Sequence, residues 1–164
     1  MPGSGVWHLI LWIHYLALSL WIGGIIFLSG VVAPTAHHSM ASRALAGEIV
    51  SKILKRLNRI ELISCSLLLT TSFSSYRFIK TSEQSLCYLI LAIGAMGLLT
   101  SFYTFYLTPR MESIKETIPT IDAVSSSHAS KIEFDRLHRI YVKLMSLNLV
   151  LGLFVLYGSV VVLK

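Results

Sequence analysis

Residues 6–32 read VWHLILWIHYLALSLWIGGIIFLSGVV and contain no Lys, Arg, Asp or Glu. About 20 apolar helical residues cross a bilayer, so this run predicts a membrane-spanning helix. Two features point beyond a simple anchor. His14 lies inside the run, and an intramembrane ionisable residue is by default a candidate for function. Trp21 opens the motif WIGG, in which Gly23 and Gly24 would let a neighbouring helix approach closely.

The composition of the whole chain is that of a membrane protein. The chain has 164 residues, of which 54% are hydrophobic and 13% charged, and its mean hydropathy is +0.70. Soluble domains carry about 25% charged residues. The net charge of +6 comes from basic residues that flank apolar segments, where anionic lipid headgroups would contact them. No basic groove interleaved with aromatic residues is present, so nucleic-acid binding is not expected, and residues 1–164 are expected to form a single domain.

Four apolar segments predict an all-α integral membrane protein with four transmembrane helices. We expect these helices at about residues 6–32, 42–79, 85–108 and 136–163. The second is expected to start at a Ser42 cap with a long basic amphipathic extension, and Pro34 is expected to break the chain before it. The segment AVSSSHASK, ahead of the last helix, has the composition of a flexible linker.

The distribution of Lys and Arg predicts the orientation. These residues gather in the first and third connections, whereas the second holds only Arg77 and Lys80. The positive-inside rule therefore places both termini outside, with the inner cell membrane as the expected location. The first helix lacks the basic start and short apolar core of a cleaved signal peptide and should be retained. Cys65 and Cys87 fall at different depths, so no disulfide is expected between them.

A heptad count gives each predicted helix one stripe of residues that we expect to face inward. The first stripe is Trp7, Ile10, His14, Ala17, Trp21, Gly24 and Leu28. The second is Asn58, Glu61, Cys65, Leu68, Ser72 and Ser75. The third is Cys87, Ile90, Gly94, Gly97, Ser101, Thr104 and Thr108, and the fourth is His138, Tyr141, Met145, Asn148, Gly152, Val155 and Ser159. Together they predict a left-handed four-helix bundle with a partly polar interior.

Depth along the helices predicts which polar residues meet. The cytoplasmic mouth is expected to gather Asn58, Glu61, Thr108, Arg110, His138 and Tyr141. Within this group, Glu61, Arg110 and His138 would form one hydrogen-bonded network or act as separate interfacial anchors. His14 lies roughly 24 Å from the inner end of its helix, so it should not share a metal ion with His138. Its expected neighbours are Thr71, Ser72, Gly94 and the region of Val155.

His14 has two interpretations. It can be held by hydrogen bonds, to Ser72 or to a main-chain carbonyl, because buried polar groups need partners. It can instead be a ligand of haem or of a metal ion. Cys65 and Met145 lie at a similar depth and have the softness that copper prefers, but two ligands are too few, so core packing is expected there. Haem b and copper are therefore the cofactors left open.

No sequence signature of catalysis is present. The chain contains no GxSxG, HExxH, CxxC or phosphate-binding loop, and no apolar segment carries paired carboxylates. The sequence therefore favours a non-enzymatic protein.

Two resemblances extend this interpretation. HYLALSLWIGG, from His14 to Gly24, resembles the His-x6-Trp-x-Gly-Gly opening of copper-resistance D-like membrane proteins. The first helix, YLTPRMESI and FDRLHRIYVKLMSLN together resemble the transmembrane protein 205-like family. The second resemblance implies a small four-helix membrane protein and supplies no reaction. The positions that match are His14, Pro109, Arg110 and the Leu-His pair that ends at His138.

The last helix departs from that family. Tyr141 and Met145 stand where its members often have Ser and Asn, and Asn148, one turn on, is the expected substitute. The sequence therefore predicts a membrane protein that handles metal ions or small solutes, or a subunit of a homo-oligomer or larger membrane complex. The alternative is a haem-binding redox protein with His14 as an axial ligand.

Overall fold

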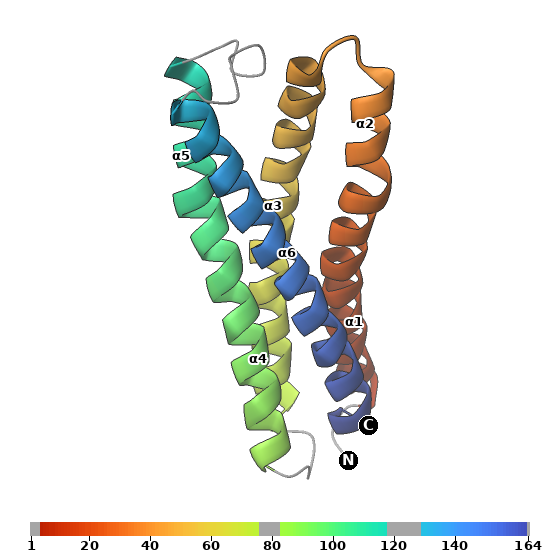
Figure 1. Ribbon diagram of the computed structural model, residues 1–164. Coiled ribbons are helices and arrows are strands. Elements are labelled where there is room, and N and C mark those ends of the chain that lie inside the picture. Colours follow the sequence, from red (N-terminus) through yellow and green to blue (C-terminus); the bar gives the residue numbers. More distant parts are fainter. Residues whose placement is uncertain (1–3, 76–82, 118–128, 164) are drawn as a thin grey trace.

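The computed structural model describes residues 4–75, 83–117 and 129–163, nearly all of which are helical. Four long segments lie side by side (Figure 1). In the first, α1 (Ser4–Phe27) continues through the π-helical turn η1 (Leu28–Val32) into α2 (Ala33–Ser39). The second is α3 (Arg43–Ser75). The third joins α4 (Glu83–Phe102), the π-helical turn η2 (Tyr103–Leu107) and α5 (Thr108–Thr117), and the fourth is α6 (Ala129–Val162).

Three of the four segments are long and apolar enough to cross a membrane. They are Gly5–Ser39, Gln84–Thr117 and Ala129–Val162. The predicted all-α class and integral membrane character are therefore confirmed. The helix expected at 42–79 is observed as α3, and residues 76–79 lie outside the described ranges. Charged residues fill the first half of α3, which lowers its hydropathy below that of the other segments.

Segments that follow one another along the chain pack side by side, and the last segment also packs against the first. α1 packs against α3 and α6, and α4 packs against the same two helices. The start of α1 and the end of α6 lie at one end of the molecule, with α2 and α5 at the other (Figure 1). Polar residues on any two neighbouring segments can therefore meet in the interior.

Pro34 and Pro109 both lie within continuous helical segments, so the break expected at Pro34 is wrong. Each follows a π turn: Ala33 N–H bonds to Leu28 O, and Thr108 N–H bonds to Tyr103 O. A proline ring inside a regular α-helix clashes with the carbonyl four residues earlier. The wider π turn relieves that clash and lets the helix continue. His37 and His38 consequently lie on α2 and are exposed.

Two other helix ends extend further than the sequence predicted. The third segment ends at Thr117 where residue 108 was expected, and α6 begins at Ala129 where residue 136 was expected. The last three residues of AVSSSHASK are therefore helical, and the rest of that stretch lies outside the described residues. The Ser42 cap is confirmed, because Ser42 Oγ accepts a hydrogen bond from Leu45 N–H at 3.2 Å.

The stripes predicted for the first, second and fourth segments match buried residues, except that Trp7, Ile10 and Gly24 are partly buried and His138 is exposed. The stripe predicted for the third is wrong except at Thr108, which is buried. The buried residues of this segment are Leu86, Leu89, Ile93, Met96, Thr100, Tyr103, Leu107, Thr108 and Met111. This helix carries small and polar residues on more than one face, so their presence alone did not fix its rotation.

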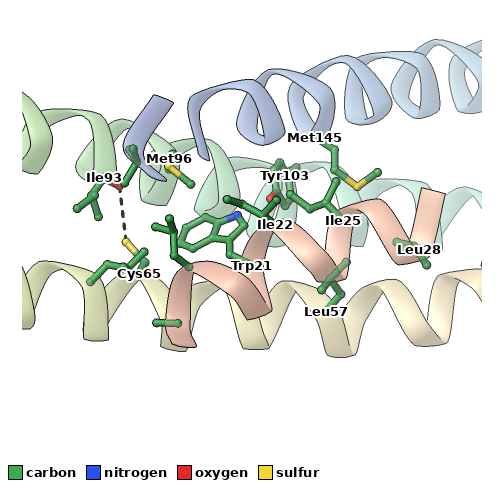
Figure 2. Packing of buried hydrophobic residues seen from close by; sticks show 14 of the residues in the cluster. Trp21, Ile22, Ile25, Leu28, Leu57, Cys65, Ile93, Met96, Tyr103 and Met145 are labelled. Carbon is green, nitrogen blue, oxygen red and sulfur yellow. Dashed lines mark hydrogen bonds between the residues drawn. The ribbon is translucent and has the colours of Figure 1, made fainter. Parts of the chain in front are cut away.

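Trp21 lies in the apolar cluster that fills the centre of the molecule. Figure 2 shows it together with Ile22, Ile93 and Met96, and the indole is fully buried. The Cys65 thiol lies 3.8 Å from the Ile93 carbonyl oxygen, which it faces as a weak donor. Cys65 is therefore a packing residue of the α3–α4 contact.

Candidate functional site

A buried carboxyl group on α3 is the centre of the polar interior. Glu61 is 0% exposed. Tyr103 Oη donates a hydrogen bond to Glu61 Oε2, and Thr100 Oγ1 lies 3.4 Å from the same oxygen. Glu61 Oε1 has no hydrogen-bond partner among the described residues. The carboxyl is thus held by neutral hydroxyl groups and has one oxygen available.

Asn148 on α6 extends this group into a network across three segments. Its Nδ2 donates to Thr100 Oγ1 at 2.8 Å and to Tyr103 Oη at 3.0 Å. The two hydroxyls themselves lie 2.9 Å apart. Because the amide protons of Asn148 point at the hydroxyl oxygens, the hydroxyl protons are free to point at Glu61. The network therefore converges on the carboxyl.

The π turn η2 helps to position this network. Tyr103 is its first residue, and the Tyr103 carbonyl accepts from both the main-chain N–H and the hydroxyl of Thr108, the latter at 2.8 Å. π turns inside α-helices are frequent at functional sites because they displace one residue from the regular helical face. The local structure here fixes the tyrosine that contacts Glu61.

A second polar pair lies next to the network, toward the end formed by α2 and α5. Tyr141 Oη donates to Asn58 Oδ1 at 2.8 Å, and both residues are buried. Asn58 precedes Glu61 by three residues and shares its helix face. The Tyr103 and Tyr141 ring centroids are 4.9 Å apart, so the two pairs are in contact. Polar side chains therefore extend from Glu61 toward α2 and α5 in two sets, which meet through the two tyrosine rings.

His14 occupies a separate site nearer the opposite end. Its Nδ1 lies 2.8 Å from Thr71 Oγ1 and its Nε2 lies 2.9 Å from Ser159 Oγ, and the ring is 0% exposed. Thr71, expected at this depth, is confirmed as a neighbour, whereas the expected partner Ser72 has no partner for its Oγ among the described residues. A neutral imidazole donates its N–H to one hydroxyl oxygen. The other hydroxyl can donate to the bare nitrogen in place of its main-chain carbonyl, which is Leu67 O for Thr71 and Val155 O for Ser159.

The expected Glu61–Arg110–His138 network is wrong. Arg110 Nε and Nη2 both donate to Glu133 Oε1, at 3.1 and 2.9 Å, and both side chains are exposed. Ten residues separate Arg110 from Thr100, which corresponds to about 15 Å of helix rise. The long arginine side chain also turns outward more readily than inward. Arg110 therefore joins α5 to α6 at the surface.

His138 likewise lies away from Glu61. It is exposed and stacks on Phe134 with ring centroids 6.3 Å apart and planes 8° from parallel. It stands about one helical turn beyond Tyr141 in the direction of α5. Of the residues expected at one mouth, Asn58 and Tyr141 are therefore brought together, while Glu61, Arg110 and His138 are not.

The glycines expected to allow close packing divide into two groups. A Cβ added at Gly24 would collide with the Leu57 side chain, and one added at Gly97 would lie 2.5 Å from Cys65 Sγ. Gly23 and Gly94 have nothing within 4 Å of such a Cβ, so the close contact expected there is wrong. Pro109 is the second residue of α5, directly after the π turn η2.

The residues present do not fit a haem or metal centre. Both ring nitrogens of His14 already contact hydroxyl groups, so ligation would break one of these contacts. Over residues 4–75, 83–117 and 129–163, no group of three or more His, Cys, Asp or Glu side chains converges on one point. Cys65 and Met145 belong to the apolar core, as expected, and both cysteines are free thiols.

Sequence reasoning missed two members of the Glu61 network, Thr100 and Tyr103. Both lie on the buried face of the third segment, and each directly precedes a residue of the predicted stripe, Ser101 and Thr104, so the prediction was off by one residue, or about 100° of helix rotation. One signal could have found them, because a tyrosine and a threonine three residues apart stand at the depth of Glu61 and Asn148. Buried polar groups need partners, and a search for partners at that depth would have favoured this face.

Comparison with known proteins identifies a family. The family model described as "Domain of unknown function (DUF4149)" matches residues 16–119, more than half of the chain. The matched range includes Glu61, Thr100 and Tyr103 and excludes His14 and Asn148. No curated protein and no solved structure matches the chain.

Proposed function

Because the chain belongs to the family of the domain of unknown function DUF4149, whose description states no activity, we propose a function from its own geometry. The protein is a multi-pass membrane protein that handles a small solute, and the Glu61 carboxyl is the proton-binding centre of that process. It acts without enzymatic chemistry. This proposal selects small-solute handling from the alternatives that the sequence left open.

The observation that carries the proposal is a fully buried carboxyl with hydroxyl partners, which forms no ion pair with any residue in the described ranges. An ionised carboxylate in a low-dielectric interior is costly unless a positive charge accompanies it. Such a group binds a proton or a cation to become neutral, and acidic residues inside membrane segments mark proton relays and solute pathways. The unpartnered Oε1 is the atom on which a proton would be bound.

The Asn58–Tyr141 pair supports a proton route from the end formed by α2 and α5. Its groups lie next to the Glu61 network, and hydroxyl and amide groups can pass a proton along with intervening water. At the opposite side of Glu61, the apolar cluster around Trp21 would block free passage. A coupled carrier requires its site to open to one side at a time, and this arrangement corresponds to the state that is open toward α2 and α5.

Metal-ion handling and haem binding are less well supported by the geometry. Among the described residues, the acidic centre has one carboxylate, with hydroxyl oxygens and the amide nitrogen of Asn148 around it, and neither a thiolate nor an imidazole. Soft metals such as copper favour thiolate, thioether and imidazole ligands. The resemblance to copper-resistance D-like proteins therefore gains no support from the site.

The proposal includes all four segments as membrane-crossing helices in a left-handed bundle. α3 packs against both α1 and α4, which are apolar enough to span, and its second half is itself apolar from Leu62 onward. We place α2 and α5 on the cytoplasmic side of the inner membrane, because the basic residues gather there. Assembly with a second copy or with a larger membrane complex is compatible with this arrangement.

Reconstituted protein tests the proton-binding centre. Infrared difference spectra between acidic and alkaline buffer should contain a protonated-carboxyl band that disappears in Glu61→Gln. Glu48→Gln is the matched control, because Glu48 is an exposed acid on the same helix, paired with Lys52 at 2.6 Å. A band that persists in Glu61→Gln would remove Glu61 as the proton-binding group.

Vesicles test solute handling. Wild-type protein is reconstituted with a pH-sensitive dye inside, and small cations, anions and neutral solutes are added class by class. At least one class should change the internal pH with wild type and Glu48→Gln, and no class should do so with Glu61→Gln. Equal responses from all three proteins would contradict the proposal.

A further inference from the structure

A cavity of about 210 Å³ lies at the end of the molecule where α2 and α5 are found (Figure 1). It is separate from the Glu61 network, and its walls come from four helices. Val50, Leu54, Met111 and Phe134 give it an apolar lining. His37, Lys115 and His138 line the same cavity from α2, α5 and α6. It therefore combines an apolar wall with three groups that donate hydrogen bonds.

The acidic residue at the cavity is already neutralised. Glu112 lines the cavity but forms an ion pair with Lys55 of α3. Lys115 forms no ion pair within 4 Å among the described residues, and its Nζ lies 5.2 Å from the centroid of the Phe134 ring. The cavity therefore has one ammonium group without a carboxylate partner, together with two imidazoles that can donate N–H bonds in either protonation state.

We propose that this cavity binds the phosphate group of an anionic phospholipid, with the glycerol and the start of an acyl chain against Leu54, Met111 and Phe134. Lysine binds phosphate as a point charge, and imidazole N–H groups add directional hydrogen bonds. Basic pockets between membrane helices are suited to such headgroups. The apolar lining favours a phosphate that carries hydrocarbon over free phosphate.

The size of the cavity agrees with a headgroup. Sites for drug-sized ligands occupy roughly 300–1,000 Å³, and this one is smaller. A phosphate with a few attached carbons fits, while the rest of the acyl chains would extend along the exposed apolar surface. The site does not depend on Glu61, so it stands or falls separately from the proposed function.

Calorimetric titration of the full chain in a neutral detergent tests the charge. The probes are short-chain phosphatidic acid, short-chain phosphatidylcholine and inorganic phosphate. Phosphatidic acid should bind one per chain, and Lys115→Gln should weaken it by roughly tenfold or more, because a charge-assisted hydrogen bond is lost. Lys52→Gln is the matched control, because Lys52 pairs with exposed Glu48 outside the cavity and should leave affinity unchanged.

A second variant tests the cavity itself without changing its charges. A Cβ added at Gly47, which lines the cavity, would have Lys115 Nζ as its nearest neighbour at 3.8 Å, so Gly47→Leu can fill the space without a backbone clash. It should abolish binding of phosphatidic acid. Gly23→Leu is the control, because Gly23 is exposed with nothing within 4 Å of an added Cβ.

The outcomes separate the sources of phosphate. The proposal is supported if phosphatidic acid binds wild type, if Lys115→Gln and Gly47→Leu each weaken that binding, and if phosphatidylcholine binds weakly. Inorganic phosphate that binds as tightly as phosphatidic acid would overturn the acyl-chain contact. Equal losses of phosphatidic acid affinity in Lys115→Gln and Lys52→Gln would overturn the proposal, and so would unchanged affinity in Gly47→Leu. Either result would mean that surface charge attracts the lipid without a defined cavity.

Discussion

Tyr103 and Glu61 stand 42 residues apart in the sequence, yet the Tyr103 hydroxyl donates a hydrogen bond to Glu61 Oε2 in the interior of the protein. The bond joins the π turn η2 to α3, and Asn148 of α6 donates to the same tyrosine oxygen. One carboxyl thus holds three helical segments together through neutral donors. Its energetic and functional roles can be separated by the substitutions below.

The Tyr103–Glu61 contact should appear as coupling in a double-mutant cycle. Glu61→Gln and Tyr103→Phe should each lower the free energy of unfolding by about 1–3 kcal/mol, because each leaves a buried polar group with fewer partners. The double variant should lose less than the sum, by roughly 0.5–3 kcal/mol. Chemical unfolding in detergent micelles measures this. Arg110→Gln is the control for Glu61→Gln and should combine with it additively, since Arg110 pairs with Glu133.

His14→Gln should be mild for stability. Hydrogen bonds inside membranes average about 0.6 kcal/mol each, and His14 makes two, so a loss of around 1 kcal/mol is expected. Thr71→Val and Ser159→Ala should each give about half of that loss. Thr70→Val is a matched control, because the Thr70 hydroxyl is exposed and bonds only to the Ser66 carbonyl. A loss of several kcal/mol would mean that His14 has a larger role in the fold.

Protein purified with its native pigments should show no haem that depends on His14. Both nitrogens of the ring are engaged by hydroxyl groups, which leaves neither free for iron. An absorption spectrum and metal analysis of wild type and His14→Gln are the measurements. A stoichiometric Soret band in wild type that His14→Gln removes would restore the haem alternative.

Gly97→Ala should destabilise the α3–α4 contact, whereas Gly94→Ala should not. The new methyl group at residue 97 would lie 2.5 Å from Cys65 Sγ, and overpacking of this kind costs about 1–3 kcal/mol. No atom lies within 4 Å of the corresponding position at Gly94. Adding Cys65→Ala to Gly97→Ala should recover part of the loss by making room. Thermal melting of these three variants and of wild type is the measurement. Equal losses of stability in Gly97→Ala and Gly94→Ala would contradict the contact.

The orientation predicts which engineered cysteines can be labelled from outside intact cells. Gly5→Cys, at the start of α1, should react with an impermeant thiol reagent, and Ser39→Cys, at the end of α2, should react only after permeabilisation. Both positions are exposed, and the exposed native Cys87 is replaced by Ser in the background. The opposite labelling pattern would invert the topology.

The sequence alone was sufficient to predict the helical segments and to predict which face of three of them is buried. Long uncharged runs fix membrane-spanning helices because an unpaired backbone in lipid is so costly. His14, Glu61 and Asn148 were assigned to the interior correctly because a charge or amide facing lipid is costly, which leaves one acceptable rotation for each helix. The positions of Pro34 and Pro109 were less informative, since a π turn before each proline removes the clash that would end the helix.

Only the tertiary structure decided the rotation of the third segment and the partners of Glu61. Leucine, isoleucine and methionine are as stable against lipid as inside the protein, so hydropathy does not say which face of α4 is buried. Packing does: Ile93 and Met96 fill the space beside Trp21, and this rotation brings Thr100 and Tyr103 to Glu61. The tertiary structure also decided that Arg110 lies at the surface. Its long side chain reaches water and Glu133 there without the cost of burying a charge.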